Sequence, residues 1–408
     1  MKLGKQKTQA VGLYVATLIG VLLGFCASVV NTDALEPEAY GNVRYVQNGI
    51  QLIATVLLFG FFMSGSRLLA LSDDENRSRR IRGTLLVILS VCAALLMLST
   101  ALAGLFHWNK PEVSSLFLLS VPVCFYPLLT NYMNTTAQGD NHIGRLILVR
   151  ILPALTYIPI AKFVYDRVGA TSERMILLQW GLYSILLLII VLSAKPSFSG
   201  IGPVFKELKK ENKEYGIQLY LGSLAMVATN YLAGVTLGIF NADNTNVGFY
   251  TLALTLTQPL SYLPGIVGTA YFKKFVHEPH IPGKVLWVTI GMTVASCVVF
   301  MILISPLVNI MYDESYSIVG KYASALALGF SFHGVGDMFN RYLGSHGQGN
   351  SIKYSCYISG IFKILGSVFL VMFWNVNGAV LTVIISSAIY CLCLYLYYKK
   401  YIGLSDKV

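Results

Sequence analysis

The chain has 408 residues and a formal net charge of +11, with 55% hydrophobic and only 12% charged residues. Soluble domains carry roughly 25% charged residues, so this composition excludes an ordinary soluble protein. The apolar residues do not alternate with period two, as they would in a membrane β-barrel. The basic excess is spread over many loops, so we do not expect nucleic acid as a partner. The composition therefore predicts an all-α polytopic membrane protein.

About twelve apolar runs follow one another along the chain, each long enough to cross a hydrocarbon core of roughly 30 Å. The predicted spans are 10–30, 47–70, 83–106, 113–134, 143–165 and 175–194 in the first half, and 216–239, 251–272, 285–311, 322–343, 355–374 and 378–398 in the second. The first run follows Lys2, Lys5 and Lys7 but lacks a small-residue cleavage site. We interpret it as a retained span and not as a signal peptide.

Prolines lie inside several of these runs, and each is expected to kink or loosen its helix. They are Pro122, Pro127, Pro153, Pro159, Pro259, Pro264 and Pro306. The seven cysteines also lie in the apolar runs, and no C-x-x-C pair occurs. We therefore expect neither a disulfide framework nor a metal site.

Two patterns recur at about half the chain length. Tyr132 followed by Gln138-Gly139 has a counterpart 210 residues later, in Tyr342 followed by Gln348-Gly349. The spacing of 26 residues from Gly41 to Arg67 recurs from Gly248 to Lys274. These patterns predict two six-helix lobes, 1–194 and 216–408, joined by a linker, 195–215. Transporters built from repeats bind their substrates between the repeats, so we expect a central cavity.

The distribution of basic residues predicts the orientation. Of the 30 Lys and Arg residues, 21 fall in the termini and loops of one side. Cytoplasmic loops carry the excess of Lys and Arg, so we expect both termini in the cytoplasm and two parallel lobes. The linker segment Phe205-Lys206-Glu207-Leu208-Lys209-Lys210 fits either a basic helix on anionic membrane lipids or an ordinary positive-inside loop.

Ionisable residues inside spans are costly and are functional candidates by default. Lys363 lies near the middle of the eleventh span, and Arg150 lies about a third of the way into the fifth. The two spans correspond, although the residues are 213 apart and not 210. Cations on two cavity walls would attract an anionic substrate such as a phosphate or pyrophosphate. An internal salt bridge for either residue, or snorkelling of Arg150, is the alternative.

Three further groups of polar residues are weaker candidates. His333, Asp337 and Arg341 are spaced four residues apart and therefore share one helix face. They could form a polar stripe in the cavity that is linked to proton movement, or Asp337 could simply pair with Arg341. Arg44, Asn48 and Gln51 form a second stripe on one helix face. These residues could line the outer mouth of a cavity and contact sugar hydroxyls, or they could be a solvated helix start. Asn230 in the seventh span is a further candidate of the same kind.

Several motifs of enzymes are absent from the sequence. It contains no G-x-x-x-x-G-K-[ST] phosphate loop, no G-x-S-x-G and no H-E-x-x-H. We therefore expect no ATP-driven motor, no cofactor and no enzymatic activity.

The local patterns of both halves resemble one transporter superfamily. They are Ala39-Tyr40-Gly41-Asn42, Leu58-Phe59-Gly60 and Ser66-Arg67 in the first half, and Asn246-Val247-Gly248-Phe249-Tyr250, Pro259-Leu260 and Phe272-Lys273-Lys274 in the second. With the repeat, they resemble the polysaccharide-transporter branch of the MATE-like (MOP) flippase superfamily, and most closely bacterial O-antigen flippases of the Wzx type.

This resemblance implies export of an undecaprenyl-diphosphate-linked oligosaccharide from the cytoplasmic to the periplasmic leaflet of a bacterial inner membrane, by alternating access. Glycosyltransferases and an O-antigen polymerase would be partners. An H⁺ or Na⁺ gradient, the membrane potential or product removal would drive transport. A MATE-type drug antiporter is the main rival, but Asp337 is the one carboxylate that we place firmly inside a span. Short outer loops and the duplication disfavour a membrane-embedded polymerase or acyltransferase.

Overall fold

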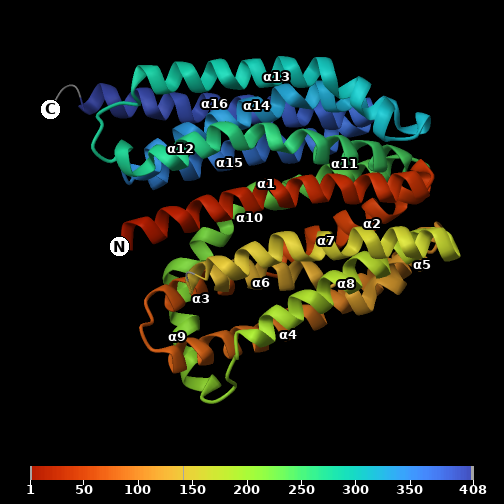
Figure 1. Ribbon diagram of the computed structural model, residues 1–408, viewed down its shortest axis with the longest axis horizontal. Helices are drawn as coiled ribbons and strands as arrows, with labels where there is room; N and C mark the ends of the chain where they lie inside the picture. Colours follow the sequence, from red (N-terminus) through yellow and green to blue (C-terminus); the bar gives the residue numbers. More distant parts are fainter. Residues whose placement is uncertain (1, 141, 406–408) are drawn as a thin grey trace. The chain divides into compact units, whose positions relative to one another are not determined.

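The computed structural model of the protein describes residues 2–140 and 142–405. Every regular element within these residues is helical (Figure 1), as the composition predicted. The chain divides into two compact units, Met1–Leu224 and Ala225–Val408, and the linker belongs to the first. Some cations of the charge argument lie outside the described residues or side chains, namely Lys2, Lys5, Lys7, Lys273 and Lys407.

Unit 1 holds the predicted spans of the first half and a helix in the linker. Its elements are α1 (Lys2–Ala34), α2 (Pro37–Val56), α3 (Phe61–Ala70), α4 (Glu75–Phe106), α5 (Pro111–Ser120), η1 (Val121–Val123), α6 (Tyr126–Gly139), α7 (Ile143–Val168), α8 (Ser172–Ser193), α9 (Ile201–Glu211), η2 (Asn212–Gly216) and the start of α10 (Ile217–Phe240).

Unit 2 repeats the order of long helices. It continues α10 and adds α11 (Thr245–Thr257), η3 (Gln258–Ser261), α12 (Tyr262–Phe275), α13 (Gly283–Met311), η4 (Glu314–Tyr316), α14 (Ile318–Ser345), α15 (Gly349–Leu365), η5 (Gly366–Leu370) and α16 (Val371–Ser405). Asn375 has a non-helical backbone (φ 54°, ψ −131°) within α16 and separates the eleventh predicted span from the twelfth. All twelve predicted spans thus lie in helices.

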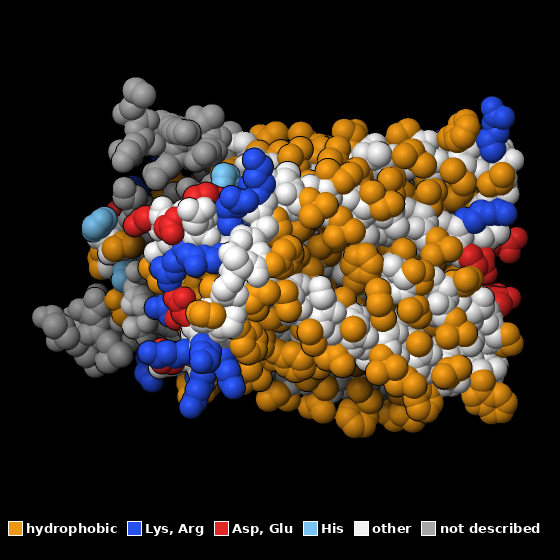
Figure 2. Space-filling view, turned by 90° about the horizontal axis from the view of Figure 1, so that it is seen from below, with side chains coloured by type: hydrophobic (Ala, Val, Ile, Leu, Met, Phe, Trp, Pro, Cys, Tyr) orange, Lys and Arg blue, Asp and Glu red, His pale blue; other side chains and the backbone are white. Residues whose placement is uncertain are grey.

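The long helices have the apolar surface of a multi-pass membrane protein. By length and composition, seven helical segments of the described residues can cross a membrane, or eight if α2 and α3, bent by 62°, form one span. One of them, Gly349–Gly403, has 55 residues and holds two predicted spans. Figure 2 shows a broad hydrophobic band on one face, with most of the visible Lys and Arg at one end and a smaller group at the other.

The break between α2 and α3 occurs without a proline. Phe59 and Gly60 have positive φ angles of 46° and 79°, which end α2 and redirect the chain into α3. A helix break inside a span leaves carbonyl groups that need other donors. Three side chains of unit 1 supply them: Tyr220 donates to the Val56 carbonyl (2.7 Å), Cys92 to that of Leu57 (3.3 Å) and Asn212 to that of Phe59 (3.0 Å).

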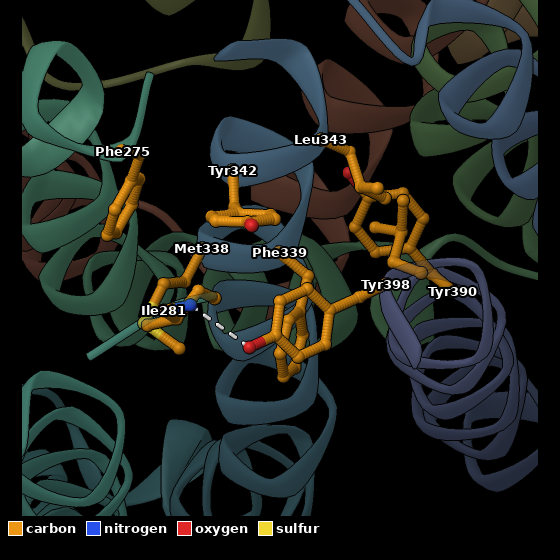
Figure 3. Close-up of a cluster of buried hydrophobic side chains, with 9 residues drawn as sticks. Phe275, Ile281, Met338, Phe339, Tyr342, Leu343, Tyr390 and Tyr398 are labelled. Carbon is orange, nitrogen blue, oxygen red and sulfur yellow. Dashed lines mark hydrogen bonds between the residues drawn. The ribbon is translucent and has the colours of Figure 1, made fainter. Parts of the chain in front are cut away.

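The repeated tyrosines make similar contacts in the two units. The Tyr132 hydroxyl donates to the backbone carbonyl of Arg82 at 3.2 Å, near the start of α4. The Tyr342 hydroxyl donates to the Pro279 carbonyl at 2.6 Å, just before α13. Tyr342 also packs in an aromatic cluster with Phe275 and Tyr398 (Figure 3). Tyr132 therefore links α6 to the first turns of α4, and Tyr342 links α14 to the segment before α13.

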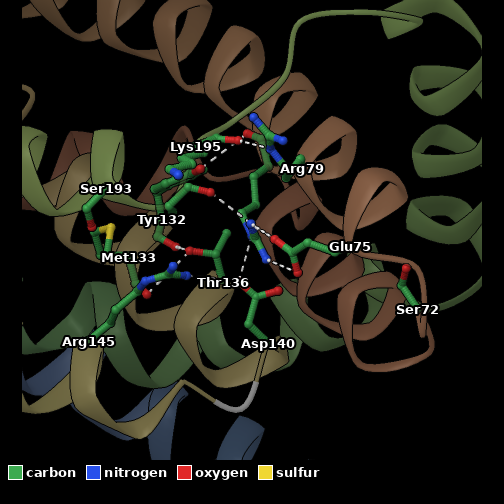
Figure 4. A network of polar contacts seen from close by, with 12 residues as sticks. Ser72, Glu75, Arg79, Tyr132, Met133, Thr136, Asp140, Arg145, Ser193 and Lys195 are labelled. Atoms are coloured by element: carbon green, nitrogen blue, oxygen red, sulfur yellow. Dashed lines mark hydrogen bonds and ion pairs between the residues drawn. The ribbon is translucent and has the colours of Figure 1, made fainter.

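A buried ionic network fixes the Gln-Gly turn of unit 1 (Figure 4). The Arg82 side chain is 2% exposed and donates to Asp140 at 2.7 Å, to Glu75 at 3.0 Å and to the Ala194 carbonyl at 2.9 Å. Asp140 directly follows Gln138-Gly139, whereas Asn350 holds that place in the second half. Sequence analysis used Arg82 only as one of the basic residues that set the orientation, because two of its partners, Asp140 and Ala194, are distant in the sequence.

Candidate functional site

Lys363 bonds a polar side chain on the first long helix of unit 2. Its ammonium group on α15 donates to the Oδ1 atom of Asn230 on α10. The Lys363 side chain is half-buried and Asn230 is exposed. Two residues that sequence analysis proposed independently are thus brought together.

Arg150 makes the same kind of contact in unit 1. Its guanidinium on α7 donates to the Oγ1 atom of Thr17 on α1. In both units the fifth long helix supplies the cation and the first supplies a neutral oxygen, with 133 residues between the partners. Sequence analysis missed Thr17, because a single threonine in an apolar run gives no signal of its own.

The two contacts are equivalent within the internal repeat. Asn230 follows Thr17 by 213 residues, and Lys363 follows Arg150 by the same 213 residues. This offset is three residues longer than the 210 that separates Tyr132 from Tyr342. The structure therefore places a cation and a neutral oxygen at corresponding positions of both units.

Neither cation has an acidic partner. Among the ion pairs between described side chains, none includes Arg150 or Lys363. The described side chains therefore show no internal salt bridge for either residue. A hydroxyl or amide oxygen orients a cation but does not neutralise its charge. A charge that is not neutralised inside a membrane span requires water or an anion nearby.

The polar stripe of α14 is organised by an aromatic residue of α16. The Tyr390 hydroxyl donates to Asp337 at 3.0 Å and accepts from Asn340 at 2.7 Å. The His333 ring stacks on the Tyr390 ring, with centroids 4.9 Å apart. His333 also lies within electrostatic reach of both Asp337 and Lys363. Sequence reasoning missed Tyr390, because many tyrosines are scattered through the spans.

Arg341 does not neutralise Asp337. No ion pair joins them among the described side chains, so the predicted self-satisfied pair is wrong. Both residues lie along α12, where Gly265 and Gly268 leave room: a Cβ atom at Gly268 would come within 3.0 Å of Arg341. Asp337 and Arg341 thus both face α12, whereas the His333 ring stacks on Tyr390 of α16.

The second predicted stripe lies on α2 and points partly into unit 1. Arg44 donates to Gln47 at 2.8 Å, and Gln47 donates to Gln179 of α8 at 3.0 Å. The Arg44 guanidinium also lies over the Tyr40 ring, 4.8 Å from its centroid. Asn48 is buried and Gln51 is half-buried. A solvated helix start would bond mainly to water, whereas Arg44 and Gln47 bond to protein side chains.

No metal site is visible in the part of the chain that the structure describes. It holds no group of three or more His, Cys, Asp or Glu side chains that could bind a metal ion. The cysteines are unpaired thiols.

The fold defines the class of protein. An inward-facing multidrug resistance transporter of the MATE family, in the MOP superfamily, is 14% identical with a TM-score of 0.72, over 98% of this chain and 99% of that one. The lipid II flippase MurJ, in an inward closed conformation, is 15% identical with a TM-score of 0.72, over 96% and 87%. A MOP superfamily transporter from Pyrococcus furiosus Vc1 is 13% identical with a TM-score of 0.60, over 98% and 97%. The chain has the fold of the MOP superfamily.

The family follows from the sequence match. Residues 9–272 match the family model described as "Polysaccharide biosynthesis protein". The match covers more than half of the chain, so the chain belongs to this family, as the sequence patterns predicted. None of the curated proteins matches it.

Proposed function

We propose that this protein flips an undecaprenyl-diphosphate-linked oligosaccharide, an O-antigen repeat unit, from the cytoplasmic to the periplasmic leaflet of a bacterial inner membrane by alternating access. The observation that carries the proposal is the pairing of Arg150 and Lys363 with neutral oxygens. A diphosphate complements such charges and accepts charge-assisted hydrogen bonds from them. Membership of a polysaccharide biosynthesis family supports a glycan as the rest of the substrate.

A MATE-type drug antiporter is the competing function, because a MATE transporter shares the fold. A carrier of cationic compounds needs acidic groups where the substrate binds. Asp337 already accepts a hydrogen bond from Tyr390, and the cations lack acidic partners among the described residues. For the Pyrococcus furiosus transporter, reverse polarity of the binding pocket is likewise described as suggesting a different function. Charge thus favours an anionic substrate here.

The driving force and the partners are further parts of the proposal. An H⁺ or Na⁺ gradient or the membrane potential would power the cycle, with His333 and Asp337 as the proton-linked pair. Glycosyltransferases would supply the lipid-linked glycan, and an O-antigen polymerase would consume it. The protein makes and breaks no bond, so it needs no cofactor.

Complementation of a deletion strain tests the proposal. Loss of the gene should leave lipid-linked repeat units facing the cytoplasm, measured as loss of surface polysaccharide. Lys363→Ala should reduce surface polysaccharide about tenfold at equal protein level, because one charge-assisted contact is lost, and Lys363→Arg should retain more. Lys162→Ala is the matched control, since Lys162 forms an exposed ion pair with Asp166 at 3.3 Å.

Two results would contradict the proposal. Normal surface polysaccharide together with altered drug sensitivity in the deletion strain would favour the antiporter. Wild-type polysaccharide with both Lys363 variants would remove Lys363 from the mechanism.

A further inference from the structure

We infer that Thr17 and Asn230 are positioning residues, each of which orients a span cation while leaving its charge free for an anionic substrate. This inference rests on the proposed function, because it assigns roles within the same candidate site. Each unit would then need both the cation and the neutral oxygen to bind the anionic substrate.

The recurrence of the contact is the first support. In both units the contact joins the fifth long helix to the first, and its two partners are 133 residues apart in the sequence. Each unit therefore holds its own cation by a separate pair of residues.

The hydrogen-bonding state of Thr17 is the second support. Its hydroxyl donates to the Leu13 carbonyl at 2.8 Å, one turn earlier in α1. Because the proton is engaged there, the oxygen is left to accept from Arg150. Thr17 therefore acts toward the guanidinium as an acceptor alone.

A glycine three positions after Thr17 lets the two helices of unit 1 come close. A Cβ atom at Gly20 would lie 3.1 Å from the Arg150 carbonyl oxygen, so α1 and α7 approach closely there. This close approach lets the short Thr17 side chain reach the cation on α7.

Both acceptor side chains, Thr17 and Asn230, are uncharged. A carboxylate at either place would hold the cation more strongly and would also cancel its charge. Asn230→Asp is nearly isosteric, so it keeps the contact with Lys363 and changes only the charge. A merely structural contact would tolerate or even gain from this substitution, whereas a positioning residue would not.

Binding of undecaprenyl diphosphate to the purified full-length protein in lipid nanodiscs tests the inference. Thr17→Val, Asn230→Leu and Asn230→Asp should each raise the Kd about tenfold, and Thr17→Ser should stay close to wild type. Thr32→Val and Thr236→Val are matched controls, because these hydroxyls donate to carbonyls of their own helices. The controls should leave the Kd unchanged.

A double-mutant cycle separates positioning from general packing. If Asn230 acts through Lys363, Asn230→Leu combined with Lys363→Met should bind no worse than Lys363→Met alone. Independent, additive losses would overturn the inference, and so would wild-type binding by Asn230→Leu and Asn230→Asp. If Asn230→Leu does not fold, Asn230→Asp decides alone. Equal binding by wild type and Lys363→Met would instead refute the proposed function, and the inference with it.

Discussion

Basic side chains on the helices of this protein differ in the charge of the groups they bond. Arg82 meets two carboxylates and a carbonyl and is almost fully buried, so its charge is cancelled within the protein. Arg150 and Lys363 meet only neutral oxygens among the described residues. Partner charge and burial together therefore separate the structural cation Arg82 from the candidate binding cations Arg150 and Lys363.

The Arg82 network yields a prediction about stability. Asp140→Asn should lower the free energy of unfolding by about 3 kcal/mol, because it breaks a buried pair whose side chains are 2% and 4% exposed. Glu75→Gln should cost less than about 1 kcal/mol, since the Glu75 side chain is 69% exposed. Thermal unfolding of the two purified variants in one detergent measures the difference. Equal stability of the two would show that Asp140 does not anchor the turn.

The helices of this chain break for two kinds of reason. At Pro122 and Pro259 the predicted kinks are present as short 3₁₀ segments, because proline removes a backbone donor. Pro153, Pro159 and Pro306 lie inside continuous helices. The break at Phe59-Gly60 depends on a positive φ and on donors from elsewhere in unit 1. Local sequence predicted the first kind and not the second.

The α2–α3 break makes a prediction about glycine. Gly60→Ala should destabilise the protein by about 3 kcal/mol or more, because the new Cβ would lie 2.6 Å from the backbone of Gly216 at a φ of +79°. Gly291→Ala should be tolerated, since nothing lies within 4 Å of its Cβ position on α13. The yield of monodisperse protein and its melting temperature test the pair. A fully stable Gly60→Ala variant would mean that the break can relax.

At the scale of the whole chain, hydropathy and internal repetition predicted the helical fold, the twelve helical runs and the family. The helical runs were predictable because every span needs enough consecutive apolar residues to cross the bilayer. The cations Arg150 and Lys363 were also predictable, because charge in a span is conspicuous. Their partner Thr17, and Tyr390 beside Asp337, were not, because ordinary residues become significant only through contacts made by folding. Orientation is a property of the whole chain that the charge pattern predicts and labelling can test.

Cysteine labelling tests that orientation in both halves at once. In a cysteine-free background, Asp33→Cys at the end of α1 and Asp243→Cys after α10 should react with an impermeant maleimide in intact cells, because both sites are exposed and follow an odd number of predicted spans. Lys209→Cys on α9, also exposed, should react only after permeabilisation. Labelling of Lys209→Cys in intact cells would reverse the predicted topology. Labelling of Asp33→Cys but not Asp243→Cys would make the halves inverted and not parallel.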